Sequence, residues 1–434
     1  MRPSIVYVSL DTTRADRLGL YGAERPTSPQ LDALAEHALV FDAMRAPSGN
    51  TLLSHASLFT GLFPRAHGAR PAGKVAALPD AARTLAEDFA EAGYDCAAFT
   101  THAEWLSPAF GMHQGFDHFD ASRDAAPQVL QRVRAWLDAR ESERPFFLFV
   151  HLFDVHSDQH GRPYAAPEST AGRFTQPPGE VARDWEVEPV GGSLFLRGVH
   201  RGYLELRPGE VDELLAQYDE GLLALDAEIG AFLTEVRNER APRAWISVSA
   251  DHGEEFFEHG SPLHYSLYEE ILRIPWLLVP PARAAPAWAT PRRLAAPVSL
   301  LDVRRTLVAL AGLPRASADH GRDLLPWLRG ERGPPKPTPF PLLTAGLIME
   351  NWKLVRPPGG AWELYDLAHD PHELNDLAAT ERGREPLANL LAELQRLDEE
   401  HVVIANALHS QEVRASPELD AEAQQHLEAL GYTR

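Results

Sequence analysis

The stretch that decides the fold is Ile5-Val6-Tyr7-Val8-Ser9-Leu10-Asp11-Thr12, an apolar run that ends on a carboxylate. A short, nearly continuous apolar run of this kind is typical of a strand buried on both faces of a parallel sheet. In open α/β sheets, ligands bind at the carboxyl ends of the strands. Asp11 is therefore a candidate ligand for a hard cation, with a plain helix cap as the structural alternative.

Similar apolar runs recur along the chain and are separated by helical patterns. The first helical pattern starts at Ser28-Pro29 and carries Leu31, Leu34, Ala35, Ala38 and Leu39 on one face. Strands that alternate with helices predict an α/β fold with a large, mainly parallel sheet flanked by helices. The further predicted strands are Cys96–Phe99, Phe146–Phe153, Trp245–Val248 and Trp276–Val279, and a long helix is predicted over Val211–Val236.

The composition changes along the chain predict two domains. Residues 1–330 form the catalytic domain, in which residues 157–209 are an irregular insertion rich in Pro, Gly and charge, typical of a functional loop or lid. Residues 331–434 form a small C-terminal α+β subdomain. It is expected to contain a hairpin made by Trp352–Val355 and Trp362–Leu367, and a final helix over Ser416–Leu430.

Charge and composition exclude several classes of function. The chain has 434 residues and a net charge of −21, which argues against binding to nucleic acid or to an anionic membrane. We find no apolar stretch of membrane-spanning length and no secretory signal before Ile5, so a cytoplasmic protein is expected, or a periplasmic or secreted one if the start is misassigned. The single cysteine, Cys96, is expected to be a buried structural thiol. The oligomeric state stays open.

A second candidate site is Asp251-His252-Gly253-Glu254, which follows the predicted strand at Trp245. Adjacent side chains on a strand point to opposite faces, so Asp251 and His252 can bind one ion only if the backbone turns, which Gly253 permits. Mixed oxygen and nitrogen ligands suit Mn, Zn, Mg or Ca, although imidazole disfavours a pure calcium site.

A third candidate is the stretch Thr51-Leu52-Leu53-Ser54-His55-Ala56-Ser57-Leu58-Phe59-Thr60-Gly61, which resembles a loop entering a helix. The free amides and dipole of a helix start favour a bound anion. The structural alternative is that Thr51 and Ser54 simply cap the helix.

With these motifs in this order, the chain resembles the sulfatase family of the alkaline phosphatase superfamily. The family's nucleophile motif runs Cys or Ser, any residue, Pro, Ser, Arg, three residues, Thr, Gly. Aligned on Thr60-Gly61, Thr51 takes the nucleophile place, Ser54 the serine place and His55 the arginine place, while Leu53 replaces the proline. Asp11 matches the family's first metal ligand, and Asp251-His252-Gly253-Glu254 matches its second metal motif.

The resemblance extends over nearly the whole chain. Phe153-Asp154-Val155-His156 is similar to the family's histidine after a central strand, and His264 lies where many sulfatases have a lysine facing the substrate anion. Leu364-Tyr365-Asp366-Leu367 matches a later landmark. The resemblance implies an alkaline-phosphatase-like sandwich fold.

Thr51 departs from the family, because sulfatases use a formylglycine made from Cys or Ser. The methyl group on the Thr51 β-carbon prevents that modification, so no formylglycine is expected. The resemblance then implies a hydroxyl nucleophile activated by one divalent ion, held by Asp11, Thr51, Asp251 and His252.

A second departure is Thr12, where many sulfatases have another Asp. The missing carboxylate favours Mn or Zn over Ca or Mg. Asp16 is expected to have a structural role, either as a capping residue or as the ion-pair partner of Arg14.

Three histidines, His55, His156 and His264, are expected to bind the substrate anion or to act as general acids, with a structural role as the alternative for each. His259 is a weaker candidate. Asp158 and His160 lie in the insertion, where solvated loop polarity is the simpler interpretation.

The sequence therefore predicts a hydrolase that cleaves phosphate or sulfate esters through Thr51, with phosphodiester or phosphonate-type esters preferred. The expected substrate is a small molecule or a glycan or lipid ester. The alternatives are a sulfatase that works without formylglycine, a phosphotransferase, or a degenerate relative that binds an anion without catalysis.

Overall fold

The protein is described by a computed structural model that covers residues 2–71, 75–101, 104–140, 143–157, 163–175, 192–315, 319–342, 345–357 and 359–410. Its centre is a large mixed sheet with the strand order β10-β2-β9-β6-β1-β5-β3-β4, in which β11 also pairs with β2. The strands are β1 (Ile5–Leu10), β2 (Leu39–Arg45), β3 (Asp95–Thr101), β4 (His118–Ser122), β5 (Phe146–Leu152), β6 (Trp245–Ala250), β9 (Arg273–Val279), β10 (Arg292–Leu294) and β11 (Val298–Ser299).

Most neighbouring strands of this sheet are parallel, as predicted. The exception is β9, which runs antiparallel to both β6 and β2. All five predicted strands are present, and β1 has the predicted bounds Ile5–Leu10.

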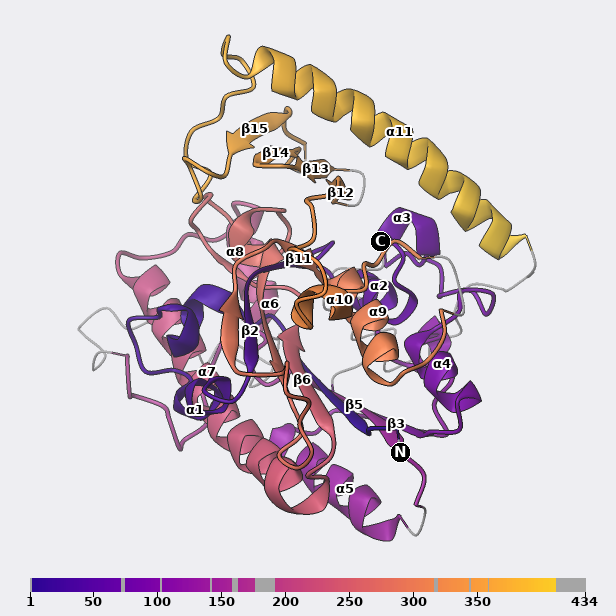
Figure 1. Ribbon diagram of the computed structural model, residues 1–434. Coiled ribbons are helices and arrows are strands. Elements are labelled where there is room, and N and C mark those ends of the chain that lie inside the picture. The colour runs from indigo at the N-terminus through magenta and orange to yellow at the C-terminus, as the bar shows by residue number, and fades with distance from the viewer. Residues whose placement is uncertain are drawn as a thin grey trace.

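Helices cover both faces of the sheet (Figure 1). Alternate residues of β1 belong to two separate cores, Ile5 and Tyr7 on one face and Val6, Val8 and Leu10 on the other, because successive side chains of a strand point to opposite faces. The first face packs against α2 (Thr51–Thr60), α4 (Leu85–Glu91) and α9 (Leu300–Leu310), and the second against α1 (Pro29–Ala35), α5 (Ala126–Ala139) and α7 (Glu210–Glu235).

The first predicted helix is shorter than its apolar stripe indicated. It ends at Ala35, because tight turns follow in which His37 N–H donates to the Leu34 carbonyl and Ala38 N–H to that of Ala35. Leu39, which we expected on the helix, is the first residue of β2. The prediction was wrong here because an apolar residue fits either a helix stripe or a buried strand.

Only part of the insertion at residues 157–209 is described, and that part is anchored to the catalytic domain. It contains α6 (Gly192–His200), and the carboxylate of buried Glu220 accepts hydrogen bonds from the backbone N–H groups of Gly172, Phe174 and Thr175. This segment is thus tied to α7. Asp158 and His160 lie outside the described residues.

The C-terminal part carries a small antiparallel sheet and one long helix (Figure 1, orange to yellow). The predicted hairpin is confirmed as β14 (Trp352–Val355) and β15 (Glu363–Asp366). The helix α11 (Arg384–His409) covers this sheet with Leu390, Leu394 and Leu397. The helix predicted over residues 416–430 lies outside the described residues.

The remaining elements are short. They are α3 (Pro64–His67), β7 (Glu255–Phe256), β8 (Pro262–Leu263), α8 (Glu269–Leu272), α10 (Leu325–Leu328), β12 (Phe340–Pro341), β13 (Gly346–Met349), three 3-10 turns (Ala15–Arg17, Gly19–Tyr21 and Pro108–Phe110) and a π turn (Val236–Arg240). Within the described part of the chain, no helix combines the length and the apolar character that a membrane crossing needs. The predicted burial of Cys96 is confirmed, and burial raises the pKa of its thiol to about 12.

Candidate active site and metal centre

The site forms where the ends of two central strands meet. Strands β1 and β6 are parallel neighbours with Leu10 opposite Ala250, so the residues that follow them, Asp11 and Asp251, lie side by side. The Thr12 N–H donates to Asp251 Oδ1 over 3.3 Å. Thr12 has a φ of 48°, an unusual value for a β-branched residue, and the strained turn directs the chain across the sheet edge.

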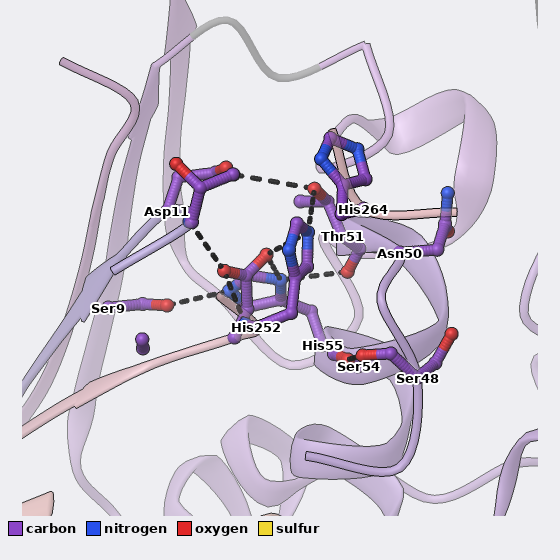
Figure 2. A network of polar contacts seen from close by, with 12 residues as sticks. Ser9, Asp11, Ser48, Asn50, Thr51, Ser54, His55, His252 and His264 are labelled. Atoms are coloured by element: carbon purple, nitrogen blue, oxygen red, sulfur yellow. Dashed lines mark hydrogen bonds and ion pairs between the residues drawn. The ribbon is translucent and has the colours of Figure 1, made fainter. Parts of the chain in front are cut away.

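The third side chain of the site comes from the first turn of α2. Asn50 caps this helix by accepting a hydrogen bond from the Leu53 N–H at 3.3 Å, so the cap is Asn50 and not Thr51. The Thr51 hydroxyl instead faces the strand ends. Its Oγ1 lies 3.3 Å from Asp11 Oδ2 and 3.4 Å from His252 Nε2, as Figure 2 shows.

Two buried carboxylate oxygens in this group lack a hydrogen-bond partner. They are Asp11 Oδ1 and Asp251 Oδ2, on side chains that are at most 1% exposed. The ion-pair partners of both carboxylates in the described part of the chain are imidazoles and not Lys or Arg. Burial, which outweighs the lowering effect of nearby His252, raises the pKa of Asp11 to about 7.

The histidine of this group is oriented as a metal ligand. His252 Nδ1 lies 2.9 Å from the carbonyl oxygen of Gly253, so it carries the proton and donates it there. The lone pair of Nε2 therefore faces Thr51 and Asp251. Ligand atoms of Asp11, Asp251 and His252 all lie within 4.8 Å of one another, and the two unpartnered oxygens beside an imidazole fit one divalent ion.

Gly253 is required for a different reason from the one we expected. Its φ is not in the left-handed region, but a β-carbon there would lie 2.1 Å from the carbonyl oxygen of Glu270. Its N–H donates to the Ile271 carbonyl over 2.7 Å. The loop that carries Asp251 and His252 is thus packed directly on α8.

Two of the predicted histidines lie together near Thr51. His264 Nδ1 is 3.1 Å from Glu254 Oε1, and the His264 ring lies 4.6 Å from that of His252 and 5.5 Å from that of His156. His264 also lines a cavity of about 580 Å³, together with Asn50. His264 thus lies at the boundary between the buried strand-end group and this cavity, and its carboxylate partner Glu254 orients the ring.

His55 contacts protein atoms through both ring nitrogens, which favours the structural alternative over the direct role in anion binding that we predicted. The ring is fully buried, with Nδ1 2.8 Å from the Thr51 carbonyl oxygen and Nε2 2.9 Å from Ser9 Oγ. Burial lowers the pKa of His55 to about 3, so the ring is neutral near pH 7. With both nitrogens engaged by protein atoms, His55 has no donor for a substrate anion and instead positions Thr51.

A further histidine was missed by sequence reasoning. His151 Nε2 lies 3.2 Å from Asp11 Oδ2, because β5 pairs with β1 and places His151 opposite Ser9. The one signal in the sequence was a histidine inside the apolar run Phe146–Phe153. That signal becomes specific only when the neighbouring strand is known.

His259 and Asp16 belong to ionic contacts outside this group. His259 Nε2 lies 3.4 Å from Glu270 Oε2, and its ring stacks on Tyr268 at 3.6 Å. The expected pair of Asp16 with Arg14 is confirmed, with a closest distance of 2.7 Å.

Comparison with known proteins agrees with this geometry. Residues 3–313 match the family model described as Sulfatase. The chain is 22% identical over 452 residues to the Delta 4,5-hexuronate-2-O-sulfatase of Bacteroides thetaiotaomicron, covering 92% of this chain and 89% of that protein. It is 21% identical over 491 residues to the N-acetylglucosamine-6-O-sulfatase of the same organism, covering 91% and 86%.

The solved structures that resemble the chain include the phosphonate monoester hydrolase of Agrobacterium radiobacter. The TM-score is 0.72 at 19% identity, and the match covers 92% of this chain and 96% of that one. The likeness shows the fold expected for the alkaline phosphatase superfamily. Since the family model spans most of the chain and the motifs meet in one site, this protein belongs to the sulfatase family of ester hydrolases.

Proposed function

We propose that this protein is a metal-dependent hydrolase that cleaves sulfate or phosphate esters through Thr51, with phosphodiester or phosphonate-type esters preferred. The observation that carries the proposal is the position of the Thr51 hydroxyl. It lies at the first residue of a helix, within 3.4 Å of both Asp11 and His252, beside two unpartnered carboxylate oxygens.

The side chains present can perform both halves of such a reaction. Asp11, Asp251, His252 and the Thr51 hydroxyl would hold a divalent ion, with Mn or Zn favoured, which supplies charge stabilisation and a more acidic hydroxyl. Thr51 Oγ1 forms a bond to the central atom and passes its proton to Asp11 Oδ2 as the ester bond breaks. His264, held by Glu254, protonates the departing oxygen.

The second half returns the site to its starting state. Water attacks the same central atom, its proton passes to His264, and the bond to Thr51 breaks as the hydroxyl recovers its proton from Asp11. The neutral ring of His55 holds the Thr51 carbonyl throughout and takes up no proton near pH 7.

The chemistry of threonine supports the preference for phosphorus. A formylglycine hydrate releases sulfate by breaking its own C–O bond, whereas a threonine ester has no such exit and must be displaced at the central atom. That displacement is feasible at phosphorus and less favourable at sulfur. Of the three similar proteins described above, two are named for sulfate esters and one for phosphonate monoesters, so both remain substrate classes to test.

The test is an assay of purified protein loaded in turn with Mn, Zn, Ca or Mg. The substrates are an aryl phosphodiester, a phosphomonoester, a phosphonate monoester and a sulfate ester. We expect the phosphodiester or the phosphonate to be cleaved fastest. Cleavage of the sulfate ester alone would refute the preference, and no turnover with no bound metal would favour a non-catalytic relative.

Substitutions of Thr51 test the nucleophile directly. Thr51→Ala should lower kcat by about 1,000-fold or more while metal content is retained, because the attacking atom is lost. Thr51→Ser is the matched control, since it keeps the hydroxyl and should retain most of the activity. Unchanged turnover in Thr51→Ala would exclude the role of Thr51.

A further inference from the structure

The cavity beside Thr51 has an unusual charge composition. The chain carries 62 Asp and Glu residues, yet none of those that the structure describes lines this cavity. Among the described lining residues, the single Lys or Arg is Arg356. The lining residues are Ser48, Gly49, Asn50, Leu53, Pro71, His264, Tyr265, Ser266, Leu267, Tyr268, Ala345, Val355, Arg356, Pro357, Gly359 and Gly360.

Arg356 is held in place without being neutralised. It follows β14 directly, and its backbone N–H donates to the Ala345 carbonyl over 2.7 Å. Its guanidinium lies over the ring of Trp362, 4.9 Å from the ring centroid. No carboxylate lies within ion-pair distance of it in the described part of the chain, whereas most other arginines in this acidic protein are paired.

Arg382, in the same subdomain, serves as a comparison because its contacts are structural. Its guanidinium also lies over a tryptophan, 5.7 Å from the ring centroid of Trp352. It is ion-paired with Asp366, however, and it does not line the cavity. An aromatic platform fixes the plane of a guanidinium, so the missing carboxylate at Arg356 leaves a fixed donor fork for another anion.

We propose that Arg356 binds a second anionic group, a carboxylate or a further sulfate or phosphate, on the leaving-group side of the substrate. This inference rests on the function proposed for Thr51. The cavity is lined by Asn50, His264 and Arg356, so a leaving group protonated by His264 would share this cavity with Arg356. Arg356 and Trp362 also line a neighbouring cavity that contains Asp398 and Glu399, so the anion is expected on the side of Arg356 that lines the cavity with His264, where no described Asp or Glu is found.

The size of the effect follows from the exposure of Arg356. A charge-assisted bidentate contact is a strong hydrogen bond, but solvent screens it at an exposed side chain. We expect a preference of about tenfold in kcat/KM for a substrate with the extra anion. The preference should shrink as salt is raised, since the contact is open to water.

The experiment uses two aryl esters that differ in one charge. Both carry the ester group that the protein cleaves best, and the ring bears either a carboxymethyl group or a carbamoylmethyl group, which keeps the acidity of the leaving phenol nearly the same. Wild-type protein should prefer the carboxymethyl ester about tenfold, Arg356→Gln should show a ratio near one, and Arg356→Lys should lie between them.

Arg382→Gln is the matched control and should keep the wild-type ratio. A wild-type ratio near one, or a tenfold ratio that survives in Arg356→Gln, would overturn the proposal.

A binding measurement separates this inference from the proposed function. Calorimetric titration of the metal-loaded protein with 4-hydroxyphenylacetate and with 4-hydroxyphenylacetamide requires no turnover. Tighter binding of the acid, lost in Arg356→Gln and kept in Arg382→Gln, supports the subsite even if every ester assay fails. Equal affinity for the acid and the amide refutes the subsite even if Thr51 proves to be the nucleophile.

Discussion

Two buried groups of charged side chains in this protein differ in how their charges are compensated. In the first, Arg304 pairs with Asp88 and Asp319, Arg305 pairs with Asp319 over 2.6 Å, and Arg83 also pairs with Asp88, so both carboxylates have arginine partners. In the second, the carboxylates Asp11 and Asp251 have only histidines as ion-pair partners, and each keeps one oxygen without a hydrogen bond.

The difference indicates which group awaits a ligand. A buried charge is costly unless it is paired, so the arginine group is complete as it stands. The carboxylates of the second group are equally buried but lack a full countercharge. A divalent ion would supply that charge, so we propose the second group, and not the first, as the functional centre.

The largest expected effect comes from breaking the first group. Asp319→Asn leaves two buried arginines with one carboxylate and should lower the free energy of unfolding by about 3–5 kcal/mol. Chemical denaturation measures the loss, and metal content should not change. Asp42→Asn, which breaks the more exposed pair with Arg293, is the control and should cost less than about 1 kcal/mol. A similar small loss in Asp319→Asn would contradict the comparison.

At the strand ends we expect the opposite pattern, which is a large loss of metal affinity with no loss of stability. Asp251→Asn should weaken metal binding by about 100-fold or more. Losing a group that only hydrogen-bonds to a metal ligand already lowers metal affinity by about 10–100-fold. The metal-free protein should lose no stability, because an uncompensated buried charge is removed. Competition with a chelator and denaturation in EDTA measure the two quantities. Unchanged metal affinity would exclude Asp251 as a ligand.

A third substitution tests the general acid. His264→Gln should lower kcat by about 100-fold for an ester with a poor leaving group, because such an oxygen needs a proton to depart. For a 4-nitrophenyl ester the loss should be much smaller. His401→Gln is the control, since its ring stacks on Phe63 and His401 is not a candidate for the site. Equal losses for both leaving groups would argue against proton donation by His264.

The smallest effect concerns three histidines outside the site, the buried His67 and His401 and the half-buried His320. Burial lowers the pKa of His67 to about 3 and of His401 to about 4, and it also lowers the pKa of His320. Below pH 6.5 the unfolded chain binds protons that the folded protein excludes, so stability should fall as pH drops from 6.5 toward 4.

His67 and His401 should each contribute about 1 kcal/mol of that loss at pH 5.5. Denaturation of wild-type protein and of His401→Gln at pH 7.5 and 5.5 measures the effect. The substitution should make the difference between the two pH values smaller. An unchanged difference would show that His401 is protonated in the folded state.

Much of the fold was predictable because its signals are local. Short apolar runs gave five strands of the central sheet, and the long stripe from Val211 gave α7. The stripe that ends at Leu39 misled us, since one apolar residue fits a helix face as well as a buried strand. The small C-terminal sheet followed from the prolines and glycines between two apolar runs.

The sequence by itself determined that Asp11, Asp251 and His252 follow the ends of two buried strands, and that Thr51, with a methyl group on its β-carbon, cannot become formylglycine. These are properties of single residues and of their neighbours in the chain. The tertiary structure alone decided that His151 meets Asp11, that both nitrogens of His55 contact protein atoms and that Arg356 lines the cavity. Those contacts depend on the strand order β6-β1-β5 and on the docking of the C-terminal subdomain, which join segments far apart in sequence.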